Sequence, residues 1–318
     1  MADAFMKAQL KNPITGAPAA IVDVRDRVAA LSKPSDPRGE AAFITARRNR
    51  IASNPRLTSE QKASLLARFR PASGAEAPVP NPVPGLPGYG FDFLPAFNVA
   101  YTNGTAITYQ VICPTTVGGN FTNFLYLTAT NRASHGLEAY VSYPLPTSTA
   151  DFNIYDWSLA QTDLQHGFVR SYPFAMLGQY LSSLSTHGKI FQTLFMHNVT
   201  FESGSNQWTN AAYLFNGVTL TWDCFYSSVY AATLAQQQSF DLAGFWGPNV
   251  ETHEATGFIF NGVGTVGFFQ AQVSTTDGAG TPVTLALLDP SNSSFDGANF
   301  GFQQVFLNPN YDWAANAP

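Results

Sequence analysis

The titratable side chains that could do chemistry are densest near the run Glu251-Thr-His253-Glu254. On a β-strand Glu251 and His253 share one face while Glu254 points away, so the pair could bind a metal ion or transfer a proton. The alternative is a solvated edge or loop, because the run follows Trp246 and a Gly-Pro pair.

A carboxylate and an aromatic residue, Glu138 and Tyr140, lie on the polar side of an alternating run whose other side is apolar. Sugar rings stack on aromatic side chains and sugar hydroxyls bond to carboxylates, so this pattern is typical of a sugar-binding face. The predicted ligand-binding residues are Glu138, Tyr140, Trp157 and Trp246. In the alternative reading, Glu138 is a solvent-facing residue without a ligand and the tryptophans belong to the core.

Glycoside hydrolysis needs a second carboxylate close to the first. Asp156 or Glu251 on a neighbouring strand, about 5 to 9 Å from Glu138, would satisfy the spacing of a glycosidase pair. The catalytic candidates are therefore Glu138, Asp156, Glu251 and His253, none with an assigned role. The chain has no G-x-S-x-G elbow, no H-E-x-x-H motif and no P-loop. The sequence predicts neither a metal site nor a cofactor, and it leaves open whether the chain is an enzyme.

Strand patterns with a period of two residues dominate from residue 91 to the end. The predicted strands are 91–100, 106–113, 122–130, 137–143, 151–157, 189–202, 209–216, 218–224, 237–246, 257–272, 282–288 and 300–307. Turn signals such as Asn216-Gly217 separate them. One helix is predicted to open at Pro173, with Phe174, Leu177, Leu181 and Leu184 as its apolar face.

This spacing predicts a mainly β fold, an antiparallel β-sandwich or jelly roll. In layout, residues 91–318 are similar to the jelly rolls of lectins and glucanases, although the closely spaced acidic strand motif of one glucanase family is missing. Cys113 and Cys224, the two cysteines, could form one disulfide or be two buried thiols.

Charge divides the chain into two parts. Residues 1–70 hold 13 of the 16 basic residues against six acidic ones, a net charge of +7, while the remainder holds three basic and 15 acidic residues, a net charge of −12. Between them, residues 71–90 contain six prolines and four glycines, which predicts an extended strap. The predicted organisation is a basic helical arm (1–70), a proline-rich strap (71–90) and an acidic β-sandwich domain (91–318).

Short helices are predicted in residues 18–70. The apolar stripe of the first is Ile21, Val24, Val28 and Leu31, and it ends at Pro34. The second spans Glu40–Ile51, and the third begins with a capping-box pattern at Thr58 and Gln61.

The basic arm has two interpretations. Arg47, Arg48 and Arg50 could meet nucleic-acid phosphates or another anionic surface. Packing of the arm on its own acidic domain is favoured instead, because acidic residues interleave with the arginines.

Three functions are consistent with these patterns. The first is a glycan-binding or surface-interaction module, whose partner is a carbohydrate or a protein surface. The second is a carbohydrate-active enzyme that uses a carboxylate pair. The third is a self-assembling shell protein, in which exchanged arms hold an oligomer together. Low charge content favours an extracellular or cell-surface location, although neither a signal peptide nor a membrane-spanning stretch is visible in the sequence.

Overall fold

The computed structural model describes part of the chain, and every structural statement below refers to that part. The described residues are 10–33, 52, 59–68, 94–95, 104–113, 122–130, 136–143, 150–161, 164–186, 189–204, 207–231, 249–253, 265–276, 282–286, 288–289, 303–308 and 312–316.

Almost all described elements are strands. In chain order they are β1 (Ile21–Asp23), α2 (Arg25–Ala29), α4 (Ser59–Arg68), β2 (Leu94–Pro95), β3 (Gly104–Cys113), β4 (Thr122–Thr130), β5 (Gly136–Tyr143), β6 (Asp151–Asp156), β7 (Phe168–Pro173), β8 (Ser182–Thr186), β9 (Lys189–Gly204), β10 (Gln207–Asn216), β11 (Thr221–Ala231), β12 (Asn249–His253), β13 (Thr265–Thr276), β14 (Pro282–Ala286), β15 (Leu288–Asp289), β16 (Gln303–Asn308) and β17 (Asp312–Asn316). Three short 3₁₀ turns lie at Leu159–Gln161, Leu164–Gly167 and Phe174–Met176. The mainly β class is confirmed.

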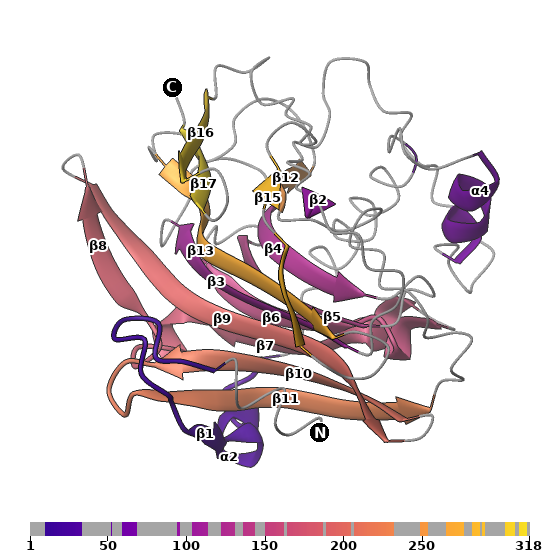
Figure 1. Ribbon diagram of the computed structural model, residues 1–318, viewed down its shortest axis with the longest axis horizontal. Coiled ribbons are helices and arrows are strands. Elements are labelled where there is room, and N and C mark those ends of the chain that lie inside the picture. Colours follow the sequence, from indigo (N-terminus) through magenta and orange to yellow (C-terminus); the bar gives the residue numbers. More distant parts are fainter. Residues whose placement is uncertain are drawn as a thin grey trace.

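Two sheets form the body of the fold (Figure 1). The large sheet has ten strands with the central order β1-β11-β10-β9-β3-β13-β17-β16, and β8 and β14 branch from β9 and β13. The small sheet has five strands in the order β12-β4-β5-β6-β7. Strands β4 and β5 contact β3, β9 and β10, so the sheets face each other as in a β-sandwich. The jelly-roll connectivity stays a prediction.

The layer between the sheets contains apolar and aromatic side chains. Phe152 of β6 and Tyr172 of β7 meet Phe225 of β11 edge-to-face, with ring centroids 5.9 and 5.3 Å from that of Phe225. All three side chains are buried. Such pairs add roughly 0.5–1.5 kcal/mol each beyond the burial of their area, so they help to join the sheets.

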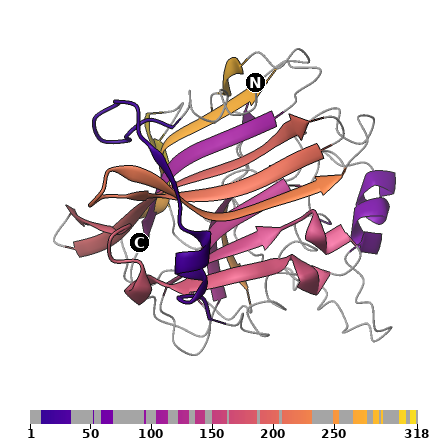
Figure 2. The same ribbon diagram turned by 90° about the horizontal axis from the view of Figure 1, so that it is seen from below.

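Residues 10–33 cross the outer face of the large sheet and reach the small one (Figure 2). Strand β1 adds in parallel to the edge of β11, with Ile21 opposite Trp222. Further along, the Lys33 backbone N–H donates to Ser171 (2.9 Å), and its ammonium group pairs with Asp151 (2.5 Å). This part of the basic arm therefore packs on its own acidic domain, as the favoured interpretation expected.

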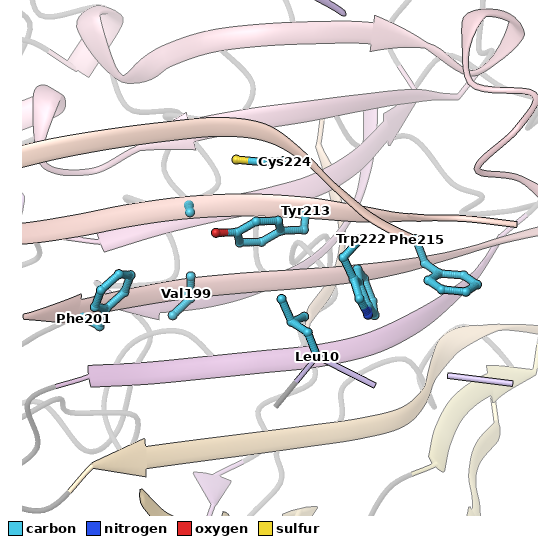
Figure 3. Packing of buried hydrophobic residues seen from close by; sticks show 8 residues of the cluster. Leu10, Val199, Phe201, Tyr213, Phe215, Trp222 and Cys224 are labelled. Carbon is cyan, nitrogen blue, oxygen red and sulfur yellow. The ribbon is translucent and has the colours of Figure 1, made fainter. Parts of the chain in front are cut away.

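Leu10 anchors that segment. Its side chain is 1% exposed and belongs to an apolar cluster on the outer face of the large sheet (Figure 3). The other buried members are Val199, Phe201, Ala211, Tyr213, Phe215, Trp222 and Cys224. The Trp222 indole N–H also donates to the Lys11 carbonyl (2.8 Å), so an apolar contact and a hydrogen bond hold the segment at one place.

Most predicted strands in the described residues are confirmed, and five were not among the predicted strands. Strands β3, β4, β5, β6, β9, β10, β14 and β16 lie where the alternation placed them, within a few residues. These strands are β1, β7, β8, β12 and β17. The predicted strand at 237–246, the helix at Glu40–Ile51 and the boundaries at 70 and 90 lie outside the described residues.

Three local predictions were wrong. The first predicted helix is β1 followed by the shorter α2, because residues 21–23 find backbone partners on β11. The helix expected after Pro173 is a 3₁₀ turn followed by β8, whose Leu184 pairs with Phe191 of β9. The strand expected at 218–224 begins only at residue 221, because residues 217–220 form the turn from β10.

The predicted helix near residues 58–69 is confirmed as α4. Cys224 is a free, buried thiol, so the disulfide alternative is wrong.

We expect Leu10→Ala to lower the free energy of unfolding by about 2–4 kcal/mol, because it leaves a cavity in the outer cluster. Ile14→Ala is the matched control, since Ile14 lies in the same segment but is 69% exposed, and its effect should stay within about 0.5 kcal/mol. Urea unfolding of the full chain measures both. Equal effects would contradict the packing of this segment on the sheet.

Candidate functional site

Three of the predicted ligand-binding residues come together on one face of the small sheet. Glu138 lies opposite Tyr155, and Tyr140 lies opposite Asn153, in the β5–β6 register. Directly opposed residues of an antiparallel pair share a face. The Trp157 indole N–H donates to Glu138 Oε2 (3.2 Å), which brings the third residue to the same face. We call the side that carries these residues the Glu138 face.

The Glu138 face is covered. Glu138, Tyr140 and Trp157 are 0%, 3% and 2% exposed, so the expectation of a solvated polar face on β5 is wrong. The ring of Tyr155 contacts that of Trp157 edge-to-face at a centroid distance of 4.7 Å. A buried carboxylate needs hydrogen-bond donors, and the indole N–H is one that the structure supplies to Glu138.

Asp156 lies on the opposite, inner face of the small sheet. Its register partner is Leu137, next to Glu138 in the chain, so the two carboxylates point to different sides. The Asn210 side-chain amide donates to Asp156 Oδ1 (3.1 Å) from the large sheet, which shows that this face points into the sandwich.

The Asp156 carboxylate accepts four hydrogen bonds. Besides Asn210, the Ser158 backbone N–H (2.8 Å), the Tyr226 hydroxyl (2.8 Å) and the Ser228 hydroxyl (2.5 Å) donate to it. Burial, and next the negative charge of Asp156, raise the pKa of Tyr226, so its hydroxyl stays protonated and able to donate. The arrangement satisfies a buried charge with donors from both sheets, which suits a structural role.

Glu138 and Glu251 lie far apart in the small sheet at the backbone level. Glu251 lies opposite Phe124, and Phe124 lies opposite Ser142, four residues beyond Glu138 on β5. Four residues along a strand span about 13 Å and two strand spacings about 10 Å, which places the two backbone positions about 16 Å apart. Asp156 therefore points to the other side of the small sheet from Glu138, and the backbone positions of Glu138 and Glu251 are well separated.

Glu251 and His253 lie on β12, at the edge of the small sheet, which agrees with the strand interpretation of that run. Glu254 and Trp246 lie outside the described residues. In the described part of the chain, no three His, Cys, Asp or Glu side chains form a group that could hold a metal ion. No described helix is long and apolar enough to cross a bilayer.

The sequence did not point to His197, a buried histidine on the outer face of the large sheet. Its Nδ1 lies 2.6 Å from the Thr108 hydroxyl, and its Nε2 has no hydrogen-bond partner in the described structure. Burial lowers the pKa of His197 to about 3, and on the same face of the sheet burial raises the pKa of the Cys224 thiol to about 11. Both groups are therefore neutral near pH 7, and a protonated thiol is a poor nucleophile.

Comparison with known proteins gives no family for this chain. No protein-family model matches it, and no curated protein matches its sequence. Among solved structures, Scytalido-glutamic peptidase with a peptide-based transition-state analogue has 9% identity and a TM-score of 0.32, covering 73% of this chain and 96% of that chain. SCP-B, a member of the Eqolisin family of peptidases, in complex with a tripeptide, has 11% identity and a TM-score of 0.31, with the same coverage of 73% and 96%.

Both neighbours are peptidases, whereas the sequence pointed toward lectins and glucanases. Likenesses at these TM-scores carry no argument about the activity of this chain.

We expect Asp156→Ala to lower the free energy of unfolding by about 3 kcal/mol or more, because buried donors from both sheets lose their charged acceptor. Asp26→Ala removes an exposed carboxylate from α2 and serves as the control, with an expected change within about 0.5 kcal/mol. Urea denaturation followed by tryptophan fluorescence measures both variants. A loss of under 1 kcal/mol for Asp156→Ala would show that this carboxylate does not join the sheets.

The pKa of His197 predicts a pH dependence of stability. The unfolded chain binds a proton at this residue near the ordinary pKa of 6.5, whereas the folded chain does so only near 3. The stability from a neutral His197 is therefore complete above pH 6.5 and falls as the pH drops toward 3, by at most about 1.4 kcal/mol per pH unit. Wild type and His197→Gln should differ in this slope, as measured by urea unfolding from pH 7 to pH 4. Identical slopes would contradict the burial of a neutral imidazole.

Proposed function

We propose that the chain is a glycan-binding β-sandwich module that uses the Glu138 face of the small sheet. The observation that supports this proposal is the hydrogen bond from the Trp157 indole to the Glu138 carboxylate, with Tyr140 on the same face. Carboxylate oxygens accept from sugar hydroxyls, and aromatic rings provide apolar surface for sugar rings.

Hydrolysis is disfavoured by the same geometry. Asp156 lies on the other side of the small sheet and accepts four hydrogen bonds, so it has no access to a ligand on the Glu138 face. A binding module needs one polar anchor and aromatic surface, whereas a glycosidase needs two carboxyl groups at a set distance.

The burial of Glu138 and Trp157 adds a condition to the proposal. A sugar can reach these side chains only if the residues packed on this face move aside, so binding includes an opening step. Association that requires a conformational change is slower than the usual 10⁵–10⁷ M⁻¹s⁻¹, to roughly 10⁴ M⁻¹s⁻¹ or less.

A glycan array probed with the full chain tests the proposal, followed by titration of the best oligosaccharide. Glu138→Gln should weaken binding about tenfold or more, because it replaces a charged acceptor by a neutral amide of the same size. Glu60→Gln makes the same exchange on the exposed face of α4 and should leave affinity unchanged.

Two results would count against this function. One is the absence of retention on every glycan by the wild type. The other is equal affinity of wild type and Glu138→Gln, with circular dichroism showing that both are folded. A folded variant that binds as tightly as wild type would place the ligand elsewhere on the molecule.

A further inference from the structure

Two turns with the same hydrogen-bond pattern lie at one end of the large sheet. In the first, Asn12 Oδ1 accepts from the backbone N–H groups of Ile14 (2.8 Å) and Thr15 (3.1 Å), and the Gly16 N–H donates to the Asn12 carbonyl (2.8 Å). Gly16 has a φ of 72°. The turn is closed both by a side chain and by the backbone, so its apex is held rigidly.

The second turn joins β10 to β11 and has the same hydrogen-bond pattern. Asn216 Oδ1 accepts from the N–H groups of Val218 (3.0 Å) and Thr219 (3.2 Å), and the Leu220 N–H donates to the Asn216 carbonyl (2.9 Å). Leu220 takes the place of Gly16, with a φ of 58°. A leucine in this left-handed region is strained, and strain of this kind persists where the surroundings impose it.

Trp222 holds the bases of the two turns together. Its indole N–H donates to the Lys11 carbonyl (2.8 Å), and its backbone N–H donates to the Ala20 carbonyl (2.8 Å). Lys11 directly precedes the first turn, and Trp222 closely follows the second. Figures 1 and 2 agree in placing the indigo turn beside the β10–β11 connection.

Each turn displays an aliphatic side chain at its apex. Ile14 is 69% exposed and Val218 is 76% exposed, and Leu220 adds a third aliphatic side chain that is 48% exposed. Threonines follow both apices, and residues 12–20 and 214–222 contain no charged residue. We call these three exposed side chains, Ile14, Val218 and Leu220, the aliphatic tip.

We propose that the aliphatic tip inserts into the surface of a phospholipid bilayer. The three side chains stand on two exposed turns, and a bilayer can receive them without a preformed pocket. No charge has to leave water when the apices enter, and the threonine hydroxyls can stay at the level of the headgroups. The net charge of +7 over residues 1–70 would add attraction to anionic lipids. This inference is independent of the proposed glycan site, which lies on the other sheet.

Co-sedimentation of the full chain with phospholipid vesicles tests the proposal. One set of vesicles contains phosphatidylcholine alone and the other also contains phosphatidylserine. Wild type should partition onto the vesicles, and the double variant Ile14→Ser/Val218→Ser should lower the partition coefficient about tenfold or more on the same vesicles. Because attraction by the basic arm is unchanged in this variant, the loss reports insertion of the tip.

Val229→Ser is the matched control. Val229 is 62% exposed on the same strand, β11, eight residues beyond Thr221 and hence about 26 Å from the turn. Its replacement should leave partitioning unchanged. Leu220→Gly separates stability from binding, because glycine relieves the backbone strain while the variant loses an aliphatic side chain. We expect an unchanged or higher unfolding midpoint together with weaker partitioning.

Three results would overturn the proposal. One is no partitioning of wild type onto either kind of vesicle, and another is equal partitioning of the double variant Ile14→Ser/Val218→Ser and the control Val229→Ser. The third is self-association of wild type that the double variant abolishes, seen by size-exclusion chromatography with light scattering. That result would identify a second copy of the chain as the occupant of the tip.

Discussion

The buried carboxylate of Asp156 is the constraint on which the arrangement of the two sheets depends. It is attached to the small sheet but accepts from Asn210, Tyr226 and Ser228 of the large one. An unsatisfied carboxylate between two sheets would be very unfavourable, so a relative shift of the sheets that broke these bonds would be resisted. Asn210 is itself fixed, because its side-chain oxygen accepts from the Thr200 hydroxyl (2.9 Å). These polar contacts thereby fix the relative position of the two sheets. Aromatic packing alone would leave that position less specific.

Local alternation was a reliable guide to the strands and a poor guide to what covers them. The run Leu137, Ala139, Val141 predicted β5 because the side-chain period of a strand is set within a few residues. The same run assigned Glu138 to a solvated face, yet that side chain is buried on the far side of the small sheet. Polarity tells which side of a strand is more polar, but whether further chain lies over that side depends on contacts that no short window contains.

The site was predictable in part. Glu138, Tyr140 and Trp157 share a face as the alternation of β5 and β6 required, and their hydrogen bond follows from a register that sequence alone leaves open. Asp156 is a candidate because of its charge, but three of its four hydrogen-bond donors come from strands 54 to 72 residues away in the chain. His197 gave no signal, because a single histidine in an apolar strand looks the same whether it is buried or exposed. Residues 21–23 fit a helical pattern in the sequence, and their strand pairing could not be predicted locally because the backbone partners of β1 are about 200 residues away.

The position of β1 has a further consequence for how this protein avoids association through its β-sheets. A long edge strand such as β11 would have unpaired backbone N–H and C=O groups with which another protein chain could form hydrogen bonds. Short edge strands are one way in which proteins prevent such pairing. Here the N-terminal segment occupies residues 222–224 of β11 with only three residues and then turns away into α2. Proteolytic removal of this segment would uncover the border of β11 together with the apolar surface beneath Leu10, leaving a chain prone to intermolecular strand addition.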